Sequence, residues 1–356
     1  MVIWKEDEGE GEGEEGCAVW GMGWVSLNVQ SLQTGPILPS PSERRLLGAL
    51  PARFRRQRLL IVGCGDVGVR VARQLSSGPG AQRVRVLALT SSPERISELR
   101  ALGVTPLLGN LDAPATLRRL AGLATRVLHL APPPGSFGGA GERDPRTLAL
   151  LRALRRGSAP MALVYGSTSG VYGDCGGAHI NETRATAPST PRAQRRVDAE
   201  RSVRQLGRAG VRASILRIPG IYAPDRDNGT PEGRLRRGTP VLAAPDDVYT
   251  NHIHADDLAR ACIAALWRGA AQRIYHASDD SELKMGDYMD LAADLYGLPR
   301  PERVPRSAAQ QQLAPSLLSF MGESRRLDNT RLHRELRVQL RYPSVREGLV
   351  AGQMLG

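Results

Sequence analysis

The sequence predicts an α/β protein: a doubly wound parallel sheet followed by a smaller C-terminal lobe. Two observations lead to this fold class. From Arg58 onward, apolar runs of strand length alternate with amphipathic runs of helix length, which is typical of a parallel sheet covered by helices on both faces. After residue 224 the alternation loosens into loops containing Gly, Arg and Pro. We therefore expect a sheet domain over residues 56–224 and a smaller lobe over residues 225–356.

The elements follow one another in a regular order. RLLIVG is a strand, and VGVRVARQL is a helix because Val67, Val71 and Leu75 recur on one helical face. RVRVLAL is the second strand, and PERISELRALG is a helix closed by Gly103. The sheet domain continues with the strand VTPLLGN, the helix ATLRRLAG, the strand RVLHLAP, the helix TLALLRALRRG, the strand MALVYGS, a helix around 192–208 and the strand RASILRI. For the smaller lobe we expect the helix ADDLARACIAALWRG, the short strand RIYHAS, the helix MGDYMDLAADLYG and a basic helical end.

The first 55 residues have a different composition. They hold an acidic Gly/Glu repeat, a stretch with tryptophans, and the Pro/Ser-rich segment PILPSPSERR. Their periodic apolar content is too low to form a core, so we expect a mostly disordered leader over residues 1–55. An upstream extension from a misassigned start codon is the alternative.

Charge and composition exclude several classes of protein. The net charge is +12, and nearly all of the basic residues are arginines scattered through amphipathic segments, a pattern that favours an anionic cofactor over a nucleic-acid surface. No apolar run is long enough to span a bilayer, and no export signal is visible, so we expect a cytoplasmic protein without a membrane partner. The four cysteines lack CxxC spacing and predict neither a metal site nor a disulfide scaffold.

A glycine motif lies between the first strand and the first helix. In LLIVGCGDVG, Gly63, Gly65 and Gly68 have GxGxxG spacing. Gly63 allows the tight turn, Gly65 lets the backbone approach a pyrophosphate, and Gly68 allows close packing of helix on strand, while the helix N-terminus supplies N–H groups to the anion. We therefore expect a Rossmann-type dinucleotide site, and a glycine turn without a ligand is the alternative. The expected contacts are Gly63, Cys64, Gly65, Asp66, Val67 and Gly68.

The end of the second strand indicates which dinucleotide is bound. An acidic residue there would bind the ribose hydroxyls of NAD, but the segment reads LTSSPER. Thr90, Ser91, Ser92 and Arg95 suit a 2′-phosphate, so NADP is preferred and NAD remains possible. Ser92 could also cap the next helix. At the ends of the third and fourth strands, the candidates for the adenine and ribose walls are Asn110, Leu111, Ala131 and Pro132.

Three further segments, together with the glycine motif, carry a resemblance to a known family. They are VYGSTSGVYGD at 164–174, LRIPGIYAP at 216–224 and NHIHADDLARA at 251–261. From about Arg58 to the C-terminus the chain resembles the extended short-chain dehydrogenase/reductase family, the NAD-dependent epimerase/dehydratase group. The resemblance implies an NAD(P)-dependent oxidoreductase or epimerase-like enzyme with a small sugar-like or nucleotide-linked substrate. It also implies that Thr168 hydrogen-bonds the reacting oxygen.

The segment TPRAQRRVDAE, at 190–200, departs from that family. The family's YxxxK motif would place its tyrosine and lysine at Arg192 and Arg196 when Glu200 anchors the alignment. An arginine stays charged and cannot act as the general base, although Arg196 could still hold a ribose or phosphate. Tyr172 is a candidate replacement for the tyrosine, with a tyrosine that only lines the pocket as the alternative. The missing tyrosine also leaves open a protein that binds NADP(H) as a sensor without chemistry, and the family implies a homodimer through residues near 147–156 and 192–208.

Overall fold

The computed structural model describes residues 56–77, 84–135, 141–313 and 315–353. The expected leader, residues 1–55, lies outside the described residues. Within the described part, the predicted fold class is confirmed: strands and helices alternate along the chain and build a parallel sheet.

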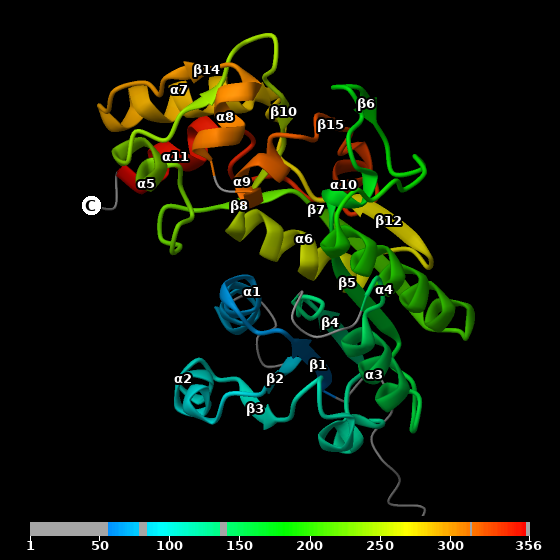
Figure 1. Ribbon diagram of the computed structural model, residues 1–356. Helices are drawn as coiled ribbons and strands as arrows, with labels where there is room; N and C mark the ends of the chain where they lie inside the picture. Colours follow the sequence, from blue (N-terminus) through cyan, green and yellow to red (C-terminus); the bar gives the residue numbers. More distant parts are fainter. Residues whose placement is uncertain (1–55, 78–83, 136–140, 314, 354–356) are drawn as a thin grey trace, which may run out of the picture. The chain divides into compact units, whose positions relative to one another are not determined.

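Seven parallel strands form the central sheet (Figure 1), in the order β12-β7-β5-β4-β1-β2-β3. The order runs in opposite directions from β1 and from β4, so the sheet has its topological switch point between these two strands. In open α/β sheets a ligand binds outside the carboxyl ends of the strands at such a point. The strands are β1 (Gln57–Val62), β2 (Val84–Thr90), β3 (Thr105–Leu108), β4 (Arg126–His129), β5 (Ala162–Thr168), β7 (Arg212–Ile218) and β12 (Arg273–His276).

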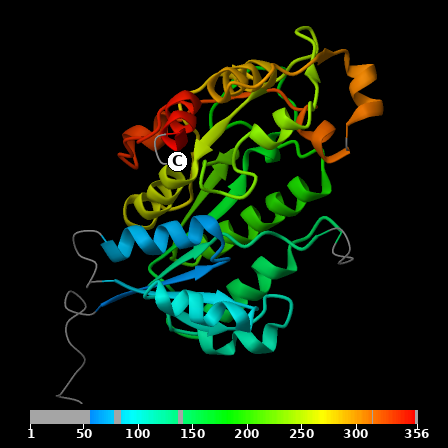
Figure 2. The same ribbon diagram turned by 90° about the vertical axis from the view of Figure 1, so that its left-hand side faces the viewer.

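Helices cover both faces of this sheet (Figures 1 and 2). The alternation of side chains along β1 shows why two layers are needed: Ile61 packs into one apolar core and Leu60 into the other, and both are fully buried. One face is covered by α1 (Asp66–Ser77) and α6 (Ala255–Arg268), and the other by α3 (Pro145–Leu154) and α4 (Pro191–Arg208). The shorter elements are η4 (Pro93–Arg95), α2 (Ile96–Ala101), η5 (Pro114–Leu120) and η7 (Ser169–Tyr172). The segment ATLRRLAG is thus a 3-10 helix where the sequence suggested an α-helix.

The expected boundary at residue 224 does not separate α6 and β12 from the sheet. The segment RIYHAS was expected in the smaller lobe, but Arg273–His276 pairs in parallel with β7 as the edge strand. A parallel edge strand needs a crossover connection, and α6, which packs against α1, provides it. The physical reason is that α6 and β12 bury apolar side chains against the sheet: Leu258 and Tyr275 belong to the apolar core on its α1 side.

The remaining elements are short and pair locally. Three two-stranded units are parallel, β8 with β11, β9 with β14 and β6 with β15, and β10 with β13 is antiparallel. These strands are β6 (His179–Ile180), β8 (Gly220–Tyr222), β9 (Val241–Leu242), β10 (Tyr249–Thr250), β11 (His252–His254), β13 (Leu283–Lys284), β14 (Arg303–Val304) and β15 (Arg326–Leu327). The helices are α5 (Glu232–Arg236), α7 (Met285–Tyr296), α8 (Arg306–Gln312), α9 (Pro315–Phe320), α10 (Thr330–Arg334) and α11 (Val345–Gln353).

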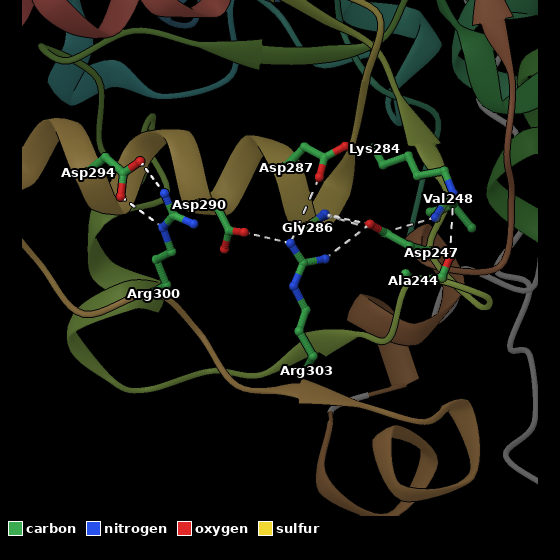
Figure 3. A network of polar contacts seen from close by, with 10 residues as sticks. All are labelled: Ala244, Asp247, Val248, Lys284, Gly286, Asp287, Asp290, Asp294, Arg300 and Arg303. Carbon is green, nitrogen blue, oxygen red and sulfur yellow. Dashed lines mark hydrogen bonds and ion pairs between the residues drawn. The ribbon is translucent and has the colours of Figure 1, made fainter.

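Arginine–carboxylate networks hold these short elements together (Figure 3). Asp247 accepts hydrogen bonds from the amide N–H groups of Val248 and Gly286, so its carboxylate caps the first turn of α7. Arg303 pairs with Asp247 at 3.3 Å and with Asp290 at 2.7 Å, joining β14 to that helix. Burial raises the pKa of Asp247. Side-chain charge thus adds to the two small apolar clusters that these elements share.

Candidate functional site

The glycine turn after β1 has the geometry of a pyrophosphate cradle. Gly63 has φ +86°, and a Cβ on it would lie 2.3 Å from the amide nitrogen of Ala131, so the turn excludes any side chain there. A Cβ on Gly68 would lie 3.2 Å from Ile61 Cγ2, where α1 packs closely on β1. Gly65 differs, because a Cβ there would meet no heavy atom of the described residues within 4 Å. The fold therefore explains Gly63 and Gly68, while Gly65 leaves open space beside the N-terminus of α1.

The other residues of the turn direct their side chains into the protein. Cys64 is buried, and burial raises the pKa of its thiol to about 11. Val67 packs against the core on the α1 side. Asp66 pairs with Arg70 at 3.0 Å and with Arg226 at 3.3 Å. These residues would contact a phosphate through the backbone, at the end of a helix whose dipole favours an anion.

Arg95 connects the end of β2 to the glycine turn. Its Nη1 donates to the carbonyl oxygen of Cys64 at 2.7 Å, and its Nε donates to Glu98 at 3.1 Å. The hydrogen bond and charge of Glu98 raise the pKa of Arg95. A permanently positive group thus lies between the end of β2 and the glycine turn.

The hydroxyl residues before Arg95 form a tight turn. Thr90 is buried, and its Oγ1 accepts from the amide of Ser92 at 3.2 Å. Ser91 is exposed and Ser92 is half-buried. Ser92 occupies the N-cap position of η4 without a capping hydrogen bond from its side chain, so the alternative role suggested for it is not seen.

The segments expected to form the adenine and ribose walls lie beside this turn. Arg146 holds both Asp112 oxygens at 2.7 and 2.6 Å and donates to the carbonyl oxygen of Pro132 at 3.4 Å. The backbone N–H of Ala131 donates to the Val62 carbonyl at 3.0 Å. Asn110 and Leu111 precede Asp112, so Arg146 ties the ends of β3 and β4 into one rim.

Thr168 and Arg196 meet at the carboxyl end of β5. Thr168 is the last residue of that strand, and its Oγ1 accepts from the amide of Gly170 at 3.2 Å. Arg196 reaches over from α4 and donates from Nη1 to the carbonyl of Gly166 at 2.6 Å and to the Tyr165 hydroxyl at 3.1 Å. Arg192 lies one turn earlier on α4, and partial desolvation together with the charge of Arg196 lowers its pKa. The two positions of the missing tyrosine and lysine therefore border the strand end that carries Thr168.

Tyr172 lies in the interior, and its geometry argues against a role in proton transfer. Its side chain is 1% exposed, and its hydroxyl lies 2.6 Å from His276 Nε2. His276 Nδ1 donates to the carbonyl oxygen of Asp328 at 2.8 Å, so Nε2 accepts and the tyrosine hydroxyl donates. Burial raises the pKa of Tyr172 to about 12 and lowers that of His276 to about 4. The VYG segment turns inward through η7, which makes Tyr172 part of the packing.

Sequence reasoning missed two features of this end of the sheet. Glu200, which served only to anchor the alignment, forms a buried ion pair with Arg217 at 2.7 Å and accepts from Ser167 Oγ at 2.7 Å. Glu323 comes from the loop between α9 and β15, and its carboxylate accepts from Ser189 Oγ at 2.6 Å and from Arg325 at 2.9 Å. Apolar periodicity gives no signal for either carboxylate, since Glu200 is held by partners on two strands and Glu323 by Ser189, which lies 134 residues earlier in the sequence.

A cavity of about 480 Å³ lies next to α5. Three arginines, Arg226, Arg234 and Arg237, are among the residues lining it, and Arg226 also pairs with Asp66 of the glycine turn. The ion pair places the cavity beside the N-terminal end of α1. The other lining residues are Pro224, Asn228, Gly229, Thr230, Glu232 and Gly233.

The part of the chain that the structure describes contains neither a membrane-spanning helix nor a metal-binding cluster. Within residues 56–77, 84–135, 141–313 and 315–353, the helices are too short or too polar to cross a membrane. The same residues contain no group of three or more His, Cys, Asp and Glu side chains placed to hold a metal ion.

This chain is similar to known proteins over most of the described residues. Residues 59–277 match the NAD dependent epimerase/dehydratase family. A protein of Schizosaccharomyces pombe without a described function is 26% identical over 227 residues, covering 62% of this chain and 74% of that protein.

Solved structures share the fold. A functionally unknown conserved protein from Silicibacter pomeroyi is 30% identical with a TM-score of 0.69, covering 84% of this chain and 98% of that one. UDP-glucuronic acid 4-epimerase from Bacillus cereus, solved in complex with NAD, is 16% identical with a TM-score of 0.64, covering 82% of this chain and 96% of that one. The family match spans more than half of the sequence, including the glycine turn, the end of β5 and β12. This chain belongs to the NAD dependent epimerase/dehydratase family.

Proposed function

We propose that this protein binds a nicotinamide dinucleotide, NADP in preference to NAD, and acts as an oxidoreductase or epimerase-like enzyme with an altered acid–base set. The observation that carries the proposal is the open space at Gly65, next to a helix N-terminus that favours an anion. The fold does not require a glycine there, but a pyrophosphate approaching the backbone does. The Bacillus cereus relative with NAD bound supports the same cofactor class.

Arg95 supports the preference for NADP. Its guanidinium joins the end of β2 to the glycine turn, and the hydroxyl residues Ser91 and Ser92 precede it in the same segment. A 2′-phosphate would gain charge-assisted hydrogen bonds at this position. Glu98 shares the guanidinium, so the preference is expected to be moderate.

The arginine-lined cavity supports a substrate with an anionic group. Arg226, Arg234 and Arg237 surround a volume of about 480 Å³, which is large enough for a small ligand. A sugar-like compound carrying a phosphate or a nucleotide diphosphate fits this charge. The name of the Bacillus cereus relative, a UDP-glucuronic acid epimerase, supports the sugar-nucleotide class.

The residues at the end of β5 would bind the reacting group. A bound nicotinamide supplies hydride chemistry. Thr168 would hydrogen-bond the reacting oxygen through Oγ1, and Arg196 would place a positive charge beside the cofactor ribose. Arg196 cannot take over the proton-transfer role of the missing tyrosine, because an arginine stays protonated. Thr168 is assigned only the hydrogen bond to the reacting oxygen.

A titration tests this function directly. NADPH should quench or shift the protein fluorescence and raise the melting temperature, with NADH binding more weakly. Gly65→Ala should weaken both dinucleotides by at least about 10-fold, since a methyl group would fill the pyrophosphate position. The melting temperature of the free variant should stay close to that of the wild type, because nothing in the described fold meets that methyl group. The proposal fails if neither dinucleotide binds at millimolar concentration.

The inward position of Tyr172 keeps a second function open: an NADP(H) sensor that performs no chemistry. Binding alone would agree with both functions. Steady turnover of any carbonyl substrate that is lost in Thr168→Val would rule the sensor out.

The family homodimer remains a prediction. The two expected helices, α3 and α4, pack against each other, and Leu148 of α3 is 38% exposed. The arginines of α4 make its outer face strongly polar. Light scattering of the purified protein would determine the oligomeric state.

A further inference from the structure

Five polar side chains from distant segments gather at the carboxyl end of β5. We call them the β5-end cluster: Thr168, Ser189, Arg192, Glu323 and Arg325. Glu323 is the acidic member, and its charge acts on Arg192 as well as on Arg325. The proposed function above assigns no role to this carboxylate.

The structure holds the Glu323 carboxylate in one position. Ser189 Oγ donates to Oε1 at 2.6 Å, and Arg325 Nη1 donates to Oε2 at 2.9 Å. The same Arg325 nitrogen donates to the Gly173 carbonyl at 2.7 Å, which ties the pair to the segment after η7. The backbone is anchored as well, since the amide of Ser324 donates to Asp174 at 2.8 Å. The side chain of Glu323 is 13% exposed, so it is accessible but constrained.

Gly170 shows that this carboxylate lies next to Thr168. A Cβ on Gly170 would lie 3.6 Å from Thr168 Oγ1 and 3.9 Å from Glu323 Oε2. The two oxygens therefore border the same small gap, which a side chain at position 170 would narrow. Because β5 lies beyond the switch point from β1 and β2, this gap belongs to the half of the crevice opposite the adenosine side. That half would receive the nicotinamide.

We propose that Glu323 is the proton-transfer residue of this site and takes the place of the missing tyrosine. The inference rests on the proposed function. A substrate hydroxyl held by Thr168 gives its proton to Glu323 Oε2, while the carbon–hydrogen bond breaks and its electron pair leaves as hydride toward an oxidised nicotinamide. The carbon–oxygen bond becomes a carbonyl, and the protonated carboxyl returns the proton when the carbonyl is reduced. A carboxylate can perform this step, which the arginines at 192 and 196 cannot.

Arg192 and Arg325 complete the arrangement. Arg325 Nη1 donates a hydrogen bond to Glu323 Oε2 and so orients the carboxylate toward the gap beside Thr168. Arg192, in the position of the family tyrosine, adds positive charge close to a developing alkoxide. Arg192, which stands in the position of the family tyrosine, would thus assist Glu323, which performs the proton transfer.

The position of Glu323 next to the nicotinamide can be tested without any substrate, by comparing how tightly the protein binds NADP⁺ and NADPH. An oxidised nicotinamide carries a positive charge that the reduced ring lacks, so a facing carboxylate favours NADP⁺ over NADPH. The measurement is the ratio of the two dissociation constants by calorimetry. Removing the charge in Glu323→Gln should weaken NADP⁺ relative to NADPH by roughly 5-fold, a factor that allows for the charge shared with Arg325. Glu323→Asp should give a ratio between those of the wild type and Glu323→Gln. The matched control is Glu302→Gln, an exposed carboxylate outside the cluster, which should leave the ratio unchanged.

The outcomes separate this inference from the function on which it rests. If the wild type binds neither dinucleotide, the proposed function fails and this inference fails with it. If both dinucleotides bind and Glu323→Gln leaves their ratio unchanged, the function stands and the role of Glu323 is overturned. If Glu323→Gln does not fold, Glu323→Asp carries the test because its shorter side chain keeps the negative charge but moves it away from the nicotinamide, and a wild-type ratio in that variant also overturns the role.

Discussion

The glycine turn after β1 and the β5-end cluster lie at opposite sides of the same crevice, and they are built in different ways. The turn is encoded in six consecutive residues, and the backbone alone determines its shape, as the φ of +86° at Gly63 shows. The cluster takes its side chains from β5, the start of α4 and the loop before β15. The comparison teaches that a backbone turn can be specified by a short motif, whereas a side-chain cluster can draw its groups from any segment that reaches the same gap, as the proposed role of Glu323 requires.

The largest effect is expected from breaking the glycine turn. Gly63→Ala puts a methyl group 2.3 Å from the Ala131 nitrogen, at a φ that side chains disfavour, so overlap and strain together should cost at least about 4 kcal/mol. Urea denaturation measures the loss. Gly103→Ala is the matched control, since Gly103 has φ +73° with open space around it, and it should cost about 1 kcal/mol. Equal losses in both variants would show that packing at Gly63 contributes nothing.

The second prediction concerns the buried ion pair beneath the cluster. Glu200→Gln leaves Arg217, which is 1% exposed, without its charge partner, and should destabilise the protein by about 3–5 kcal/mol. The double variant Glu200→Leu with Arg217→Met should recover a large part of this loss, because no unpaired charge stays buried. Thermal unfolding checks both. Stability equal to wild type in Glu200→Gln would contradict the burial of this pair.

The comparison also explains how much could be predicted from the sequence. The sheet, Arg95 beside the glycine turn and the position of Thr168 at a strand end follow from local patterns, because periodicity and glycine spacing act over a few residues. The edge strand β12 was assigned to the wrong lobe because nothing in RIYHAS states which strand it pairs with. Tyr172 looked like a candidate because its segment is shared with the family, yet its hydroxyl donates to a histidine about 100 residues later, a contact that no spacing rule supplies. Glu323 was missed for the same reason.

Acid should lower the free energy of unfolding through two buried histidines, one near each side of the crevice. Burial lowers the pKa of His129, on β4, to about 3 and that of His276, beside Tyr172, to about 4, against 6.5 for an unperturbed histidine. Because the folded pKa lies below the unfolded one, the unfolded chain binds more protons, and stability is lost as the pH falls from about 6.5 toward 4. Each histidine should cost about 2 kcal/mol at pH 5. Unfolding free energies from pH 7 to 5 measure the slope, and a flat profile would contradict the neutral, buried state.

The smallest effect is expected at the rim of the glycine turn. Arg95→Ala removes the guanidinium proposed to meet the 2′-phosphate, so NADPH should bind about 10-fold more weakly, while NADH, which lacks that phosphate, should change by less than about 3-fold. Titrations of both dinucleotides give the ratio, and Arg100→Ala, an exposed arginine on the same helical segment, is the control for general charge. If both dinucleotides weaken equally, Arg95 acts through its hydrogen bond to the Cys64 carbonyl and shapes the turn itself. In that case Arg95 would not select between NADP and NAD but would help to fix the backbone of the glycine turn, like Gly63.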